Sequence, residues 1–357
     1  MTAALDPVRV VEAAYQLGRS EEDWLLSLSA ALRPLLDAGS GVGAFLFDRQ
    51  PLQRTRFSKP ILLGAEPVLG ERLALALSIL PESVAAPTLD SPTWLTTVSQ
   101  ALGLGQDFAH HPLAITFGHP FGIRDLAAFK AVEPTGRGLV IAAPLLEISA
   151  IDGPSASKWA LCAAHVGAAL RLRTALERST ASVVDGAEAV LAPDGACANA
   201  EGPARTTAAR TALRRAVLAS EQAKSSQRRM SSQEALETWQ ALVAGRWSLV
   251  EHFESDGKRL LLAHKNDPEL PDPRGLSLRE RQVVAFAALG HSGQLTAYQL
   301  GLTRSTVARH LARAMAKLGV STRAELLQRV RGGSANEPSA SHLQKPTPHL
   351  ARKAPRS

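Results

Sequence analysis

The stretch GQLTAYQLGLTRSTVARHLARAMAKL, residues 293–318, decides the fold of the C-terminal part of this chain. It holds two segments with helical spacing of apolar residues, 293–300 and 304–318, joined by Leu300-Gly301-Leu302-Thr303. A short turn that contains glycine and is flanked by apolar residues lets two helices cross at a steep angle, as in a helix-turn-helix. Thr303 is placed to cap the second of these helices.

The helical pattern continues on both sides of this turn. Breaks at Gly290, Gly301 and Gly319 divide the region into four helices, which we expect at 277–289, 293–300, 304–318 and 322–331. Ser277 followed by Glu280 is a capping box for the first helix. We therefore predict an all-α four-helix domain over residues 274–331.

The helix at 304–318 has an apolar side and an opposite side of small and basic residues. At about 100° per residue, the residues that share the apolar side are Val307, Leu311, Ala314, Met315 and Leu318. Ser305, Arg309, Ala312 and Ala316 lie opposite, with Arg313 beside them and Thr306, His310 and Lys317 on a polar flank. Alanines let a helix approach a major groove and contact thymine methyl groups, and arginine pairs with guanine through two hydrogen bonds.

Arg309 is our candidate for reading a base, whereas the polar flank suits phosphates. The complete set of candidate DNA-contacting residues is Thr303, Arg304, Ser305, Thr306, Ala308, Arg309, His310, Ala312, Arg313 and Lys317. A solvated face of an ordinary amphipathic helix is the alternative interpretation of the same pattern.

Positive charge is concentrated in the same region. The chain has a net charge of +7, but residues 274–331 alone carry +8 and the tail 332–357 carries +3, which leaves −4 for residues 1–273. Binding to phosphates needs positive charge gathered on one surface. The low aromatic content, 4%, argues against stacking on single strands, so duplex DNA is the expected partner.

Motifs spread over some 50 residues carry a family resemblance. They are Leu276-Ser277-x-Arg279-Glu280-Arg281-x-Val283-Val284, Gly290-x-Ser292, Ala297-x-x-Leu300-Gly301-Leu302-Thr303-x-Ser305-Thr306-Val307-x-x-His310-Leu311 and Lys317-Leu318-Gly319-Val320-x-x-Arg323. In order and spacing they resemble the LuxR-type helix-turn-helix. The resemblance covers about a sixth of the chain. It implies that the third helix enters the major groove, with Thr306, His310 and Lys317 near the phosphates and Val307 in the core.

The sequence departs from the family pattern at two places. Leu278 stands where a proline is usual, and Gln294-Leu295-Thr296 replaces the common Lys-Glu-Ile. Loss of that lysine removes a phosphate contact, and Thr296 weakens an apolar site. We therefore expect a modest or dimer-dependent affinity for DNA.

The first part of the chain has an α+β pattern. We expect helices at 8–17, 23–36 and 155–177 and strands at 44–47 and 139–144, so that helices lie at both ends of a set of short strands. Residues 1–180 are therefore predicted to form a sensor domain, which faintly resembles a GAF domain. Within it, Pro112, Gly118 and Pro120 indicate an exposed loop around His110, His111 and His119.

The middle of the chain is predicted to form a second, small α+β unit at 185–265, faintly similar to part of a PAS fold. We expect a strand at 189–191, helices at 204–222 and 232–244, and a hairpin of 246–253 with 259–264 around Asp256-Gly257. Residues 266–273, with three prolines, are predicted to be a linker, and 332–357 a disordered basic tail.

Signals for other classes of protein are weak. His110, His111 and His119 with Asp107 suggest a metal site, but adjacent histidines in a strand point apart. Gly103-x-Gly105 lacks the rest of a dinucleotide fingerprint, and Cys162 lies on an apolar helix with His165 as its one candidate activator. No metal or cofactor is therefore predicted. No apolar run reaches the roughly 18 residues of a membrane span, and the first residues lack a secretory signal, so a cytoplasmic protein is expected.

Three hypotheses follow from the sequence. The favoured one is a non-enzymatic, sequence-specific transcription regulator whose residues 1–268 sense a small-molecule effector or dimerise, with the helix at 159–178 as the interface of a homodimer. The second is an enzyme or signalling scaffold in residues 1–268 with a nucleic-acid tether. The third is a helical protein-interaction module that never contacts DNA.

Overall fold

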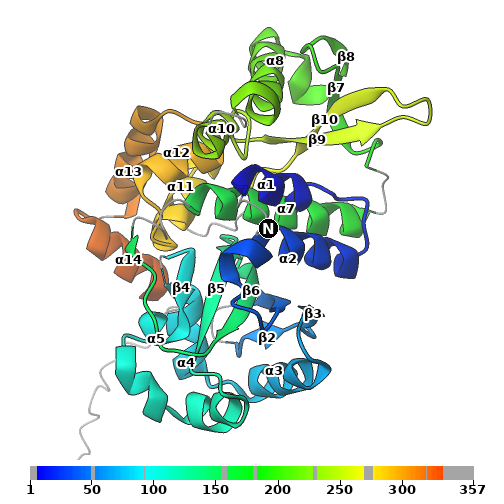
Figure 1. Ribbon diagram of the computed structural model, residues 1–357. Helices are drawn as coiled ribbons and strands as arrows, with labels where there is room; N and C mark the ends of the chain where they lie inside the picture. The colour runs from blue at the N-terminus through cyan, green and yellow to red at the C-terminus, as the bar shows by residue number, and fades with distance from the viewer. Residues whose placement is uncertain are drawn as a thin grey trace, which may run out of the picture.

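The computed structural model describes residues 6–49, 53–91, 93–153, 159–179, 183–227, 231–268, 276–318 and 320–332 (Figure 1). In this part of the chain, two antiparallel sheets with their covering helices precede four C-terminal helices. The predicted α+β class with an all-helical C-terminal domain is confirmed. Residues 269–273 of the predicted linker and the predicted disordered tail from 333 onward lie outside the described residues.

The first sheet has the strand order β2-β1-β6-β5-β4, and β3 pairs with β1. Its strands are β1 (Val42–Asp48), β2 (Arg56–Phe57), β3 (Ile61–Leu63), β4 (Leu95–Thr97), β5 (Asp125–Val132) and β6 (Arg137–Leu145). Side chains alternate between the two faces of a strand. Ala44 and Leu46 of β1 pack into the core under one face, whereas Phe45 and Phe47 pack on the other. Because helices cover both faces, β1 has no polar side chain from Val42 to Phe47.

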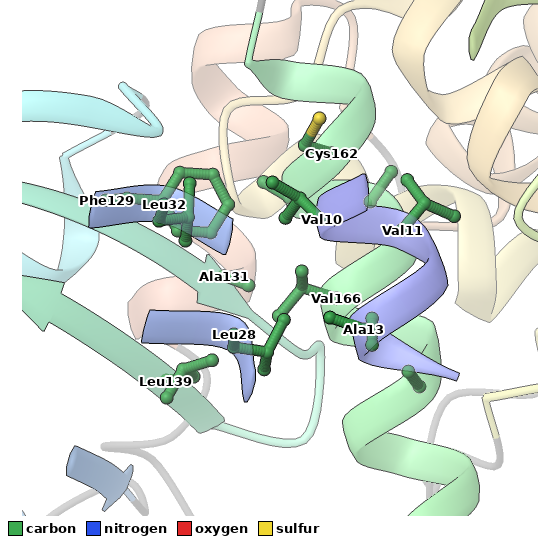
Figure 2. Close-up of a cluster of buried hydrophobic side chains, with 14 of the residues drawn as sticks. Val10, Val11, Ala13, Leu28, Leu32, Phe129, Ala131, Leu139, Cys162 and Val166 are labelled. Atoms are coloured by element: carbon green, nitrogen blue, oxygen red, sulfur yellow. The ribbon is translucent and has the colours of Figure 1, made fainter. Parts of the chain in front are cut away.

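Three helices cover one face of this sheet: α1 (Pro7–Ala14), α2 (Glu21–Leu36) and α7 (Ala160–Ser179). Figure 2 shows Val10 of α1, Leu28 of α2 and Val166 of α7 together with Phe129, Ala131 and Leu139 of the sheet. Residues 162–170 of α7 are all buried. The expectation that the helix at 159–178 forms a dimer interface is therefore wrong, because this helix is the centre of the core.

The other face is covered by α3 (Pro67–Ile79), α4 (Glu82–Asp90), α5 (Val98–Ala101) and three helical turns, η1 (Gly105–His110), η2 (Ala114–Gly118) and η3 (His119–Phe121). The predicted exposed loop around Pro112 and Pro120 is thus short helical structure. The segment is not an exposed loop because the side chains of Phe108 and Ala114 are buried, which packs these turns against the rest of the domain. Among the described residues, no single helix is long and apolar enough to cross a membrane; α3 and α4 pass that test only as a pair bent by 104°.

The second sheet has the order β8-β7-β10-β9, formed by β7 (Ala187–Leu191), β8 (Cys197–Ala200), β9 (Trp247–Phe253) and β10 (Arg259–Lys265). The predicted hairpin is confirmed, with Gly257 in the left-handed region at φ 82°. Strand β8 was not predicted from the sequence. The turn η4 (Gly202–Arg205) and the helix α8 (Thr207–Gln222) follow β8, and Leu213 and Val217 of α8 pack on one face of the sheet.

After α8, the turn η5 (Ala223–Gln227) and the helix α10 (Ser232–Thr238) lead toward the C-terminal helices. The sequence predicted a helix that continues to 244, and this is wrong. The chain turns at Trp239 into extended backbone, and Ala244 and Gly245 then have positive φ values of 48° and 66°. The segment 239–245 is therefore not a helix, and its residues contact the C-terminal domain as described below.

The C-terminal helices are α11 (Leu278–Ala288), α12 (Gly293–Leu300), α13 (Arg304–Leu318) and α14 (Arg323–Gly332). These bounds confirm the four predicted helices. The capping box is also confirmed, since the Ser277 side chain accepts from the Glu280 backbone N–H and the Glu280 carboxylate accepts from the Ser277 backbone N–H. All four helices follow from local sequence signals alone.

Candidate nucleic-acid interface

The turn between α12 and α13 fixes how these two helices cross. Gly301 ends α12 in the left-handed region at φ 59°. A Cβ atom on this glycine would lie 1.9 Å from the carbonyl oxygen of Leu242. The position therefore requires glycine for two reasons: its backbone conformation and the close approach of another segment.

Thr303 begins α13 as predicted. Its hydroxyl accepts from the backbone N–H of Thr306 at 3.2 Å and lies 2.9 Å from the hydroxyl of Ser305. The inner side of the helix buries Val307, Ala314 and Leu318. The two sides predicted for this helix are confirmed.

No described part of the chain covers the outward side of α13. Six of its residues are exposed: Ser305, Ala308, Arg309, Ala312, Arg313 and Ala316. Arg304 is exposed at the first turn, and Thr306 and His310 are half-buried on the flank. Small side chains alternate here with arginines, so the backbone of the helix can come close to a surface while guanidinium groups extend from it.

No carboxylate neutralises these arginines within the described residues: Arg304, Arg309 and Arg313 have no ion pair there. Burial lowers the pKa of His310, and the positive charges of Arg309 and Arg313 lower it further. His310 is therefore neutral at pH 7 and can accept as well as donate a hydrogen bond. The outward side is a positively charged surface with one neutral imidazole at its edge.

Lys317 differs from the other candidates. Its Nζ lies 2.7 Å from Oε2 of Glu280, whose side chain is 5% exposed. This hydrogen bond, together with the one from the Ser277 backbone, lowers the pKa of Glu280 to about 2. The structure thus places Lys317 in a contact between α13 and α11, a pairing that sequence reasoning missed because the two residues lie 37 positions apart.

The C-terminal domain contacts the rest of the chain through α11 and α12. Leu242, which is fully buried, packs among Val283, Phe286 and Val307 of the domain core. Arg279 donates to the carbonyl oxygens of Ala244 and Gly245. The segment 239–245 therefore supplies part of the domain's own core.

A polar cluster extends this contact. The Tyr298 hydroxyl lies 2.7 Å from the carbonyl oxygen of Leu236 and 2.8 Å from Nε2 of His165 on α7. Nδ1 of His165 in turn lies 3.2 Å from the hydroxyl of Tyr15, which follows α1. Burial lowers the pKa of His165 to about 4, so the imidazole is neutral. None of these contacts covers the outward side of α13.

An apolar cavity lies on the other side of the first sheet. It has a volume of about 210 Å³ and is bounded by β1, β5, β6, α3, α4 and the turns after α5. Phe45, Leu73 and Val140 are among the apolar residues that line it. The buried Asp125 borders it, but both of its carboxylate oxygens are bound by Ser99. The cavity therefore suits an uncharged, apolar molecule.

The suspected enzyme-like features do not form a site. The described residues contain no group of three or more His, Cys, Asp or Glu side chains arranged to hold a metal ion, and His110, His111 and His119 are not brought together. Cys162 is fully buried, and burial raises the pKa of its thiol. A thiolate nucleophile is not available at that position.

Comparison with known proteins identifies the C-terminal domain. Residues 274–330 match the family model described as bacterial regulatory proteins, luxR family. No curated protein matches the chain in sequence. Two similar solved structures are SdiA in complex with octanoyl-rac-glycerol (9% identity, 90% of this chain and 91% of that chain, TM-score 0.31) and Escherichia coli SdiA (10% identity, 90% and 95%, TM-score 0.26). With four helices, a glycine turn and the family's motif at the expected positions, residues 274–330 form a helix-turn-helix domain of the luxR family of bacterial regulatory proteins.

Proposed function

We propose that this chain is a transcription regulator that binds duplex DNA in a sequence-specific manner through the outward side of α13. The observation that carries the proposal is the set of small residues and arginines exposed on that side, Ser305 to Ala316, whose arginines have no ion pair within the described residues. A helix of this composition fits a major groove, where arginine distinguishes guanine from the other bases.

The candidate residues are assigned two roles. Arg309 reads a base, with Ser305, Ala308, Ala312 and Arg313 against the groove. Thr303, Arg304, Thr306 and His310 contact phosphates at the edge of the helix, because hydroxyl, guanidinium and imidazole groups are common phosphate partners. Lys317 is better assigned to holding α13 on α11, since Glu280 already binds its ammonium group.

We further propose that residues 1–180 sense an apolar small molecule in the cavity of the first sheet. The cavity has almost no polar lining, and the helices α3 and α4 form its cover. The unit at 185–265 then connects this region to the C-terminal domain through the segment 239–245. A homodimer on two DNA half-sites remains our expectation for the assembly.

The alternative is an enzyme or signalling scaffold in residues 1–268 with a nucleic-acid tether. No observation on the described residues favours it over the first proposal, because the candidate metal ligands are dispersed and the candidate nucleophile is buried. Catalytic turnover by the full chain would be its distinguishing property.

The test is a binding experiment on random-sequence genomic duplexes, with salt titration and sequencing of the retained DNA. A regulator is expected to enrich a shared motif and to show a salt-dependent affinity. A salt-dependent affinity without any enriched motif contradicts sequence-specific binding and favours the tether. Absence of binding to duplex DNA contradicts both and leaves the protein-interaction module.

A further inference from the structure

The outward side of α8 carries a second group of arginines. Arg210, Arg214 and Arg215 are exposed on this helix, and Arg205 is exposed just before it. The inner side, with Leu213 and Val217, is buried on the second sheet. The helix therefore has a buried apolar side and an exposed side that carries these arginines.

These four arginines differ from the other basic residues around them. Every other Lys or Arg within the described residues of 183–268 has a carboxylate partner: Lys224 with Glu251, Arg246 with Glu188, Lys258 with Glu254, Arg259 with Glu221 and Glu251, and Lys265 with Asp267. Within the same described segments, Arg205, Arg210, Arg214 and Arg215 have none. Acidic residues are available in this unit, but no ion pair joins a described one to these arginines; Glu221 of α8 itself binds Arg259.

The direction of the helix adds to this positive charge. The first turn of α8 contains no acidic residue, and its N-terminal end carries the positive pole of the helix dipole. Arg205 and Arg210 lie near this end, where a cation is unfavourable and a bound anion favourable, whereas Arg214 and Arg215 lie further along the helix. The first two turns present the exposed side chains of Thr207 and Thr211, whose hydroxyls can donate to an anion as well.

We propose that this side of α8, with Arg205, Arg210, Arg214 and Arg215, is a second contact surface for duplex DNA, binding phosphates outside the sequence that α13 reads. The inference rests on the proposed function. Figure 1 shows α8 in the same half of the molecule as α12 and α13, while α3 and α4 lie at the opposite end. In the proposed complex, a single duplex that docks on α13 extends toward α8 and away from the cavity-bearing region.

The chemistry of this side favours phosphate over a protein partner. All four cations are arginine, whose planar group binds phosphate through two hydrogen bonds. A protein interface needs an apolar centre, and Leu218 is the one large apolar side chain exposed among the described residues of α8. The surface is a positively charged, polar strip.

The test compares three variants of the full chain. In the first, Arg210, Arg214 and Arg215 are replaced by Gln, which keeps helix propensity on an exposed side. The matched control replaces Arg9, Arg56 and Lys59 by Gln, an equal loss of charge at exposed positions of the first domain. The third variant replaces Arg304, Arg309 and Arg313 by Ala on α13. Each is titrated with salt on random-sequence duplexes of about 12 and about 40 base pairs, roughly one and four helical turns.

The α8 variant is expected to bind the long duplex more weakly, with a salt slope smaller by about 0.9 for each lost phosphate contact and so by up to about three. On the short duplex it should equal the wild type, since no flanking DNA is present. A wild-type slope on the long duplex overturns the inference, as does an equal loss in the matched control. If the α13 variant also keeps the wild-type slope, the proposed function itself fails; if that variant alone loses affinity, only the inference about α8 fails.

Discussion

Arg309 lies in the middle of the outward side of α13, exposed and without an acidic partner in the described part of the chain. Arg309→Ala is expected to lower the affinity for the preferred sequence by about 1–3 kcal/mol and to relax the base preference at one position. Competition binding against single-base variants of the enriched motif measures both effects.

Arg304→Ala provides the comparison, because this residue is assigned to a phosphate. It should weaken binding to all sequences alike and reduce the salt slope by about one. If Arg309→Ala also weakens binding uniformly, with the base preference unchanged, Arg309 is not the base-reading residue.

Among single residues, the sequence predicted best those whose role is local. The cap at Thr303 and the capping box of Ser277 and Glu280 depend on neighbours within one turn, and the burial of Val307 follows the helical period of its own helix; all are confirmed. The pairing of Lys317 with Glu280 escaped prediction, because the same lysine could reach a phosphate or a carboxylate and helical periodicity does not distinguish them.

At the scale of elements, the turn between α12 and α13 is the most constrained feature. Gly301→Ala is expected to lower the free energy of unfolding by about 2–4 kcal/mol, since the new methyl group would meet the backbone of Leu242 and the left-handed conformation costs about 1–2 kcal/mol for an L residue. Denaturant unfolding of the full chain measures this loss.

Gly293→Ala is the matched control in the same helix. Apart from its chain neighbours and the backbone of its own helix, no described atom lies within 4 Å of a Cβ at Gly293, which begins α12. Alanine there should leave stability unchanged or raise it by up to about 1 kcal/mol. A loss at Gly293 as large as at Gly301 would show that the close approach to Leu242 is not what requires glycine.

The sequence predicted helices and hairpins whose formation depends on their own residues. It missed elements whose formation depends on residues distant in sequence. The strands β4 and β8 are short, and β8 is largely exposed, so neither has the alternating pattern of a longer strand. The helix expected at 232–244 ends early because Leu236 and Trp239 offer their carbonyl oxygens to Tyr298. The cavity and the basic side of α8 likewise depend on how elements are placed, although the arginines of α8 stand in the sequence at helical spacing.

Leu242 joins two parts of the molecule, because it belongs to the middle unit and is buried in the core of the C-terminal domain. Leu242→Ala is expected to cost about 2–5 kcal/mol, as for other fully buried leucines. Hydrogen exchange should show the loss of protection in α11 and α12, which contact Leu242, as well as in the segment 239–245. If protection falls in the segment alone, the domain does not need Leu242 for its core.

For the whole molecule, the contacts between the C-terminal domain and the rest of the chain include two buried, neutral histidines. His165 lies beside Tyr298, and the ring centre of His291 is 4.5 Å from that of Trp94, which precedes β4. Burial lowers the pKa of His165 to about 4; burial and then the charge of Arg323 lower that of His291 to about 3. Each value lies below the roughly 6.5 of an unfolded chain, so the unfolded state takes up protons first as the pH falls.

Stability from these histidines is therefore complete above about pH 6.5 and is lost as the pH falls toward 4 and 3. One pKa unit corresponds to about 1.4 kcal/mol, which makes the loss on the order of 2–3 kcal/mol for each histidine by pH 4. In denaturant unfolding at a series of pH values, His165→Gln should be less stable than the wild type at pH 7.5 but lose less stability between pH 6.5 and 4.5. His110→Gln controls for loss of an exposed histidine. Parallel pH profiles for His165→Gln and the wild type would mean that His165 has the same pKa in the folded and the unfolded protein. Protonation of His165 would then not weaken the contact between α7 and α12.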